Sequence, residues 1–370
     1  MTDDVTPKSP RERGSTLWPS PRAGGGRRSG WSGPTYYGRP QLKSAPFNNW
    51  IVGGYIFLAG LSGSASLIGT LADAAGGDRA RDVGRRGRRL ALLAPTVGSA
   101  LLIKDLHTPQ RFYNMLRLFK PRSPMSIGTW ILATFGCSAA PAAIGDWLAR
   151  RVPGFGWAGA AAKAVQVPAA AAGAGLSVYT ASLLSATSTP AWAAAPRALA
   201  VRFGASSLAS GAAALALGER DPGVRRSLHL LAAGALAVEG AAAAVQTSAY
   251  REAEVEPGTR DPWGKVEKVF ATALGVAAPL ALYGLALGLG VRRGRAAAEA
   301  AAVLTLAGSA LLRISTLGMG DESALRPEVS LAFAQPRNLR RSASGARPTG
   351  DATPRSKLPR RPPPPGRTLH

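Results

Sequence analysis

Long apolar runs separated by short polar segments are the main feature of this chain. The hydrocarbon core of a bilayer is about 30 Å thick, and a helix that crosses it needs about 20 apolar residues. Eight runs approach this length, and they span residues 49–71, 88–103, 126–148, 164–185, 191–217, 227–247, 266–291 and 296–312. The pattern therefore predicts an all-α polytopic membrane protein with about eight transmembrane helices.

The second run is weaker than the others. Its apolar part, Leu90–Ile103, is short and contains Pro95. It can cross the membrane only if Arg89 and Lys104 snorkel from its two ends to the membrane surfaces. The fifth and eighth runs are rich in alanine, which is only weakly apolar. The number of transmembrane helices is therefore seven or eight.

The alternative for an alanine-rich helix is the interior of a soluble bundle. A soluble bundle needs a hydrated face on most of its helices, and eight such runs joined by short polar loops do not fit that requirement. Glycines inside the runs fit the small-residue packing by which membrane helices approach each other closely. They are Gly60, Gly63, Gly69, Gly173, Gly175, Gly284, Gly288 and Gly290.

Composition separates an apolar middle from two polar tails. Hydrophobic residues make up 46% of the chain and charged residues 18%. Residues 1–48 carry 8 basic and 3 acidic side chains, and residues 319–370 carry 10 and 4. We expect a disordered basic tail over residues 1–45, a transmembrane bundle over residues 46–318, and a mostly disordered Pro- and Arg-rich tail over residues 319–370. An ordinary soluble enzyme is disfavoured.

Basic tails of membrane proteins commonly meet lipid headgroups or protein partners, so no nucleic-acid partner is expected.

The arginines indicate an orientation, because loops rich in positive charge tend to face the cytoplasm. One set of alternate loops holds Arg79, Arg81, Arg85, Arg86, Arg88, Arg89, Arg150, Arg151, Arg220, Arg225, Arg226, Arg292, Arg293 and Arg295. With eight helices, both tails then lie on the outer face of a bacterial cytoplasmic membrane. The basic tails themselves and the basic loop over residues 104–122 favour the opposite orientation.

Cysteine and histidine are too scarce for several kinds of redox centre. The single cysteine, Cys137, excludes a disulfide framework and an iron–sulfur or zinc site built from cysteines of this chain. Of the three histidines, His107 lies in a predicted loop, His370 is the last residue, and only His229 begins a run. A haem held by two histidines inside the bundle is therefore not expected.

The densest polar cluster lies between the second and third runs. Asp105 and Arg111 are separated by a turn at Pro109, so they can pair after the chain reverses. One interpretation is a salt bridge that shapes this connection. The other is a polar wall for a small redox-active headgroup, since ionisable groups near hydrocarbon are costly and are commonly functional.

Further polar side chains lie near the ends of other runs. The Tyr179 phenol, near the end of the fourth run, cannot reach the carbonyls of its own helix and requires another partner. At the start of the first run, Asn48 and Asn49 are either helix caps or site residues, and Tyr55 follows inside the run.

Glu239 is the acidic residue nearest the middle of a predicted span. A carboxyl group in hydrocarbon is either protonated, paired or in contact with a polar cavity. We therefore expect Glu239 either to hydrogen-bond between helices or to belong to a proton path between the two faces.

Several motifs, taken in their order along the chain, resemble those of a known family, the polysulfide reductase membrane subunits, also called NrfD-like. The resemblance covers about residues 37–336. Two positions depart from the family pattern: His107 stands where glycine is usual, and Arg326 where an acidic residue is common. The motifs are Tyr37–Pro40 with Lys43, Tyr55–Gly63, Asp105–Phe112 with Ser123–Ser126, Tyr179–Trp192, and Arg313–Pro327.

This resemblance implies two four-helix bundles and a subunit that binds menaquinone or ubiquinone. It also implies electron exchange with a ferredoxin-like four-cluster iron–sulfur subunit on the outer face, which connects to a molybdopterin or multihaem catalytic subunit in anaerobic respiration. The chain itself would hold neither haem nor iron–sulfur cluster. The implied quinone site comprises Asn49, Tyr55, Asp105, His107, Arg111 and Tyr179.

The residue types of this site suit quinone chemistry. Tyr179 and His107 can donate hydrogen bonds to the carbonyl oxygens, and Asp105 or His107 can relay a proton. Arg111 would hold Asp105 ionised and stabilise negative charge on the headgroup. The alternatives are a quinone-free structural anchor and a secondary transporter. Transport is disfavoured by the scarcity of polar residues within the runs and the lack of a clear inverted repeat.

Overall fold

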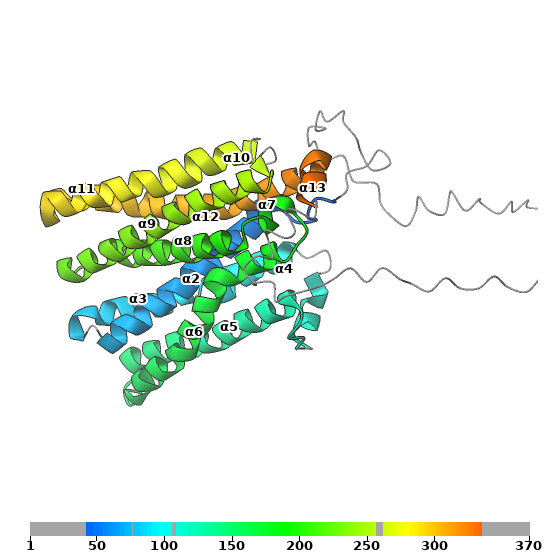
Figure 1. Ribbon diagram of the computed structural model, residues 1–370. Helices are drawn as coiled ribbons and strands as arrows, with labels where there is room; N and C mark the ends of the chain where they lie inside the picture. Colours follow the sequence, from blue (N-terminus) through cyan, green and yellow to red (C-terminus); the bar gives the residue numbers. More distant parts are fainter. Residues whose placement is uncertain (1–41, 76, 106–108, 118, 257–261, 335–370) are drawn as a thin grey trace, which may run out of the picture.

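The protein is helical throughout the residues that its computed structural model describes, which are 42–75, 77–105, 109–117, 119–256 and 262–334 (Figure 1). The elements are α2 (Asn49–Ala75), η1 (Asp78–Ala80), α3 (Arg81–Ala91), η2 (Ala94–Gly98), α4 (Ser99–Asp105), η3 (Pro109–Leu116), α5 (Pro124–Arg151), α6 (Trp157–Ser185), α7 (Pro190–Ala193), α8 (Pro196–Leu217), α9 (Pro222–Glu252), α10 (Pro262–Val266), η5 (Glu267–Ala277), α11 (Ala278–Arg293), α12 (Arg295–Leu325) and α13 (Pro327–Phe333).

Seven helical segments in the described part are long and apolar enough to cross a membrane. They are Asn49–Ala75, Pro124–Arg151, Trp157–Ser185, Pro196–Leu217, Pro222–Glu252, Pro262–Leu289 and Arg295–Leu325. Their outward faces carry apolar residues such as Val238, Val245 and Leu285, each at least 50% exposed. Large charged side chains such as Arg313 are buried inside instead. This arrangement confirms a multi-pass membrane protein.

The weak second run forms an interrupted helix that packs along α2. It consists of α3, the π-turn η2 and α4, and the interruption surrounds Pro95, which has no backbone N–H to donate. The backbone N–H of the preceding residue, Ala94, donates to the Ser62 hydroxyl of α2, at 3.0 Å. The expected count of seven or eight is therefore confirmed as seven long segments, one of which contains the π-helical stretch η5, and one further interrupted segment.

The helices pack in two groups of four. The first comprises α2, α3–α4, α5 and α6, and the second comprises α8, α9, α10–α11 and α12. Helix α2 also contacts α8 and α12 and so joins the groups.

Glycine permits the closest helix contact in each group. Gly63 of α2 lies against the backbone of Gly173 in α6, and Gly275 of η5 lies against Gly308 in α12. The same packing was expected at Gly284 and Gly288, and there it is wrong: a Cβ on either would meet nothing within 4 Å, because both lie on an outward face of α11. Gly290 is outside the described side chains.

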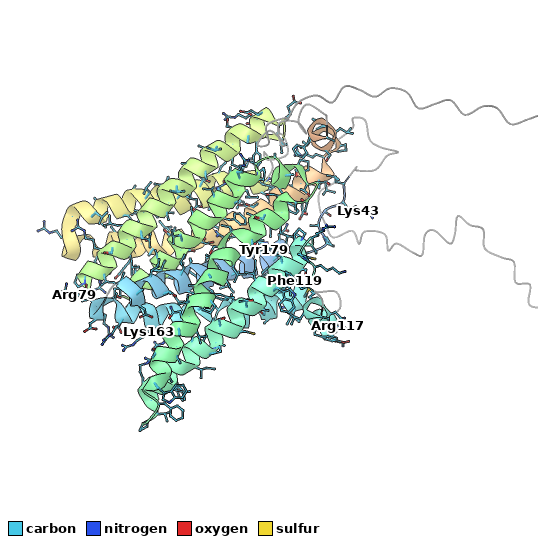
Figure 2. All side chains as sticks on the ribbon, turned by 60° about the horizontal axis from the view of Figure 1, so that its bottom comes forward. Lys43, Arg79, Arg117, Phe119, Lys163 and Tyr179 are labelled. Atoms are coloured by element: carbon cyan, nitrogen blue, oxygen red, sulfur yellow. The ribbon has the colours of Figure 1, made fainter. Side chains whose placement is uncertain are left out.

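The two ends of the bundle differ in charge. We call the end that holds the α2–α3, α5–α6, α8–α9 and α11–α12 connections the basic end, and the opposite end the terminal end. Figure 2 shows Arg79 and Lys163 toward the basic end, and Lys43 and Arg117 at the terminal end. Both ends of the described chain lie at the terminal end, where the Ala45 backbone N–H donates to Asp321 at 2.9 Å.

Arg88 is a loop cation in the sequence interpretation, and the structure corrects this. It lies in α3 and is 4% exposed. Its guanidinium pairs with Asp73 of α2 and Asp146 of α5 and donates to Gln166 of α6. A buried arginine surrounded by carboxylates joins helices and contributes little to the charge of the basic surface.

The C-terminal part of the described chain is more ordered than expected. The boundary placed at residue 318 falls inside α12, which continues to Leu325 and is followed by α13. Residues 319–333 thus close the terminal end.

Candidate functional site

Three predicted site residues lie near the terminal end of the first helix group. Asp105 is the last residue of α4, and its carboxylate accepts the backbone N–H of Asn48 at 3.2 Å, just before α2. Tyr55, farther along α2, lies within electrostatic range of both Asp105 and Tyr179. Tyr55 of α2 thus lies near Asp105 of α4 and near Tyr179 of α6.

Tyr179 is held by the start of α5 (Figure 2). Its hydroxyl donates to the Pro124 carbonyl at 2.8 Å, which supplies a partner outside its own helix. Its ring lies directly on Gly128, where a Cβ would overlap the ring carbon that bears the hydroxyl. Ser123 caps α5 by accepting the Ser126 N–H, and Pro124 occupies the first helical position, so both side chain and cap fix this corner.

Asn48 and Asn49 have different roles. The Asn48 side chain accepts the backbone N–H groups of Trp50 (2.9 Å) and Ile51 (3.3 Å), so it caps α2. The Asn49 amide donates to Asp321 of α12 at 2.9 Å. Its Oδ1 is buried and has no hydrogen-bond donor among the described residues. Asn49 therefore faces α12 and presents an unused acceptor.

Two predicted site residues are not placed. His107 lies outside the described residues, and so does the side chain of Arg111, whose backbone belongs to η3. The pair between Asp105 and Arg111 stays a prediction.

The end of α12 forms a wall that sequence reasoning missed. Asp321 binds both Ala45 and Asn49, and one oxygen of the neighbouring Glu322 is buried without a partner among the described residues. The signal was available in the two glycines followed by two acids, Gly318-Met-Gly-Asp-Glu322, after Leu317. It was assigned to a tail because the apolar run had ended.

Trp192 fixes this wall against the start of α2. Its indole N–H donates to the Thr316 carbonyl at 2.7 Å, and its ring stacks on Phe47 with centroids 6.3 Å apart. A Cβ on Gly320 would overlap the indole, so glycine is required there for the ring to lie against α12.

A second polar cluster lies inside the other helix group, around Glu239 of α9. Glu239 is 2% exposed; it contacts the Ser206 hydroxyl and lies within electrostatic range of Arg202 and Arg313. Arg313 is 1% exposed and donates to the hydroxyls of Ser206 (2.8 Å) and Ser207 (2.8 Å) of α8. It also donates to the Ser309 hydroxyl at 2.7 Å and to the Phe203 carbonyl at 3.1 Å.

The polar side chains continue from this cluster toward the terminal end. Arg202 forms an ion pair with Glu267 of η5 and donates to Gln246 at 3.0 Å. Gln246 donates to the Tyr250 hydroxyl at 2.7 Å, which in turn donates to the Ala191 carbonyl at 2.7 Å. These residues line a small pocket that also includes Glu256, Lys268 and Met319.

Toward the basic end, the surroundings of Glu239 are apolar. The buried residues of α9 in that direction are Leu236, Ala235, Ala232 and Leu228, and they pack against Leu215 and Ala216 of α8. Polar contacts therefore extend from Glu239 in one direction.

The described part of the chain contains no group of three or more His, Cys, Asp or Glu side chains suited to an ion. The tyrosines, carboxylates and unused acceptor at the terminal end suit an organic ligand with carbonyl or hydroxyl groups.

Comparison with protein families gives a match to the model described as polysulphide reductase, NrfD, over residues 40–321. A comparison with curated proteins gives no match. Members of the matched family are membrane subunits of respiratory oxidoreductase complexes and generally assemble with iron–sulfur and catalytic subunits. The match covers both helix groups and both polar clusters, and the chain therefore belongs to the polysulphide reductase NrfD family.

Proposed function

We propose that this chain is the quinone-binding membrane subunit of its complex. It exchanges electrons between menaquinone or ubiquinone in the membrane and a ferredoxin-like four-cluster iron–sulfur partner, and through it a molybdopterin or multihaem subunit. The observation that supports this proposal is the position of Tyr55 near both Asp105 and Tyr179 toward the terminal end. A structural anchor requires no such cluster at the edge of hydrocarbon.

The residues present fit a quinone headgroup. A bound quinone supplies reversible chemistry of two electrons and two protons. The Tyr55 hydroxyl can donate to one of its carbonyl oxygens. The Tyr179 hydroxyl donates its single proton to the Pro124 carbonyl, so its oxygen can accept a hydroxyl when the ligand arrives reduced. Asp105, at the open end of α4, can take up or release a proton.

The chain's own contacts orient these side chains before the ligand binds. Pro124 holds the Tyr179 hydroxyl, and Gly128 leaves room for its ring. The Asn48 N–H holds the Asp105 carboxylate. Prearranged side chains lose less entropy on binding than free side chains do.

We expect Tyr179→Phe to lower quinol turnover by about 10- to 100-fold and Asp105→Asn by about 100-fold or more, because each removes a hydrogen-bonding or proton-transfer group. The measurement is quinol oxidation by membranes that contain the assembled complex. Tyr283→Phe, a buried tyrosine of α11, is the matched control and should leave turnover unchanged. Undiminished turnover in both site variants would remove the proposed site.

Gly128→Ala tests the position of the Tyr179 ring in a second way. The added methyl group overlaps the Tyr179 ring and displaces it without changing the phenol itself. Its turnover should fall as in Tyr179→Phe, and the combination of both changes should lose no more than the larger single effect. Independent, multiplicative losses would argue that Tyr179 and Gly128 act separately.

We infer that the terminal end faces outward and the basic end faces the cytoplasm of a bacterial cell, with both tails on the outer face. The exposed arginines at the basic end support this orientation. The iron–sulfur partner would then dock beside Asp105 and the end of α12.

The polar side chains that continue from Glu239 support a proton path that opens toward the terminal end. Glu239→Gln keeps the size of the side chain and removes the titrating group, so we expect fewer protons released per electron in liposomes while quinol oxidation continues. Adding Gln246→Glu to this variant places a titrating group back among the same polar side chains, and the double variant serves as the comparison. A proton-to-electron ratio unchanged by Glu239→Gln would leave Glu239 with a structural role only.

A further inference from the structure

We propose that the basic end binds the phosphate group of an anionic phospholipid in a cleft between α9, α11 and α12. The cleft lies outside both polar clusters described above and does not depend on quinone binding. It is lined by Pro222, Arg225, Arg226, His229, Ala286, Leu287, Gly294, Arg295 and Ala298.

The cleft carries an excess of positive charge. Arg225, Arg226 and Arg295 line the cleft, and Glu299 pairs with Arg295 at 2.8 Å and also acts on Arg225 and His229. Arg226 forms no ion pair with any residue in the described ranges. Arg225 has only a marginal contact, at 3.5 Å, with the Glu219 carbonyl. The three arginines outnumber the one carboxylate, so the cleft attracts an anion such as a phosphodiester, and arginine binds phosphate oxygens through several N–H groups at once.

The backbone holds these side chains at a fixed separation. Asp221 caps α9 by accepting the Val224 N–H at 2.9 Å, which fixes the turn that bears Arg225 and Arg226. On the other side, a Cβ on Gly294 would overlap the backbone of Ala286, so the α11–α12 turn is tight and places Arg295 beside α11.

The surroundings favour a lipid over a free anion. The floor of the cleft is apolar and includes Ala286, Leu287 and Ala298. It adjoins outward faces on which Leu230 of α9 and Leu285 and Leu289 of α11 are 51%, 51% and 48% exposed. Acyl chains can lie on these faces while the phosphate stays with the arginines, at the level where basic pockets between membrane helices meet headgroups.

The test is native mass spectrometry of the purified full chain after delipidation, with phosphatidylglycerol or phosphatidylcholine of identical acyl chains added back. We expect phosphatidylglycerol to be retained at least about tenfold more than phosphatidylcholine. The triple variant Arg225→Gln, Arg226→Gln, Arg295→Gln should lose roughly that preference. The matched control changes the exposed Arg79, Arg81 and Arg151 of the same end to glutamine and should keep it.

Three results would overturn the proposal. They are equal retention of the two lipids, equal loss in the cleft and control variants, and displacement of the lipid by excess inorganic phosphate, which would indicate a free anion site. Thermal unfolding provides a second measurement, because it compares the effect of the lipid on the wild type, the control variant and the cleft variant. Phosphatidylglycerol should raise the melting temperature of the wild type and the control, and not that of the cleft variant.

Discussion

Arg313→Met is expected to destabilise the folded bundle by about 3–5 kcal/mol, the range found when one member of a buried charged network is removed. Arg313 is 1% exposed and serves hydroxyls and carbonyls of both α8 and α12. Methionine fills much of the volume but leaves Ser206, Ser207 and the Phe203 carbonyl without their donor. It also removes one of the two cations, Arg202 and Arg313, that lie within electrostatic range of Glu239.

The loss can be measured as the yield of folded protein and as thermal unfolding in detergent. Arg79→Met, an exposed arginine at the basic end, is the control and should change stability by less than about 0.5 kcal/mol. The double variant with Glu239→Gln should recover part of the loss, because the uncompensated carboxylate is then gone. An unfolding temperature for Arg313→Met equal to that of the control would contradict the assigned role.

The second large effect is expected at the glycine contact of the first helix group. A Cβ on Gly63 would overlap the Gly173 carbonyl oxygen and lie 2.8 Å from its carbon. Backbone atoms cannot rotate away as a side chain can, so Gly63→Val must separate α2 from α6. We expect a cost of about 3 kcal/mol or more, at the upper end of overpacking effects.

Gly284→Val is the matched control, since a Cβ there meets nothing within 4 Å. It introduces the same residue into a membrane helix without a close neighbour. Thermal unfolding of the two variants separates helix contact from helix propensity. Similar melting temperatures for Gly63→Val and Gly284→Val would show that the contact is unimportant.

Hydropathy located the membrane helices well and their ends less well. The third and sixth runs were started at Ser126 and Ser227, whereas the helices begin at Pro124 and Pro222. In both cases a capping side chain and a proline precede the apolar residues. Hydropathy alone does not detect these helix-start signals. The run that ended at Leu312 continues because Arg313 finds its partners on α8.

The site was predicted in part for a similar reason. Tyr55, Asp105 and Tyr179 lie near the ends of apolar runs, where polar residues are conspicuous, and the structure places Tyr55 near the other two. Asp321 and Glu322 follow a buried arginine that resembled the end of a helix, so they were assigned to the tail. Only the packing of α12 against α2 shows that Asp321 belongs beside Asn49.

The interruption at η2 gives the two halves of one membrane segment unequal freedom. Upstream, α3 is anchored through the buried Arg88 to three other helices. Downstream, α4 has no buried residue and ends at Asp105. Local opening costs least where few contacts are lost, so opening of this membrane segment is expected to begin in α4 while α3 keeps its contacts.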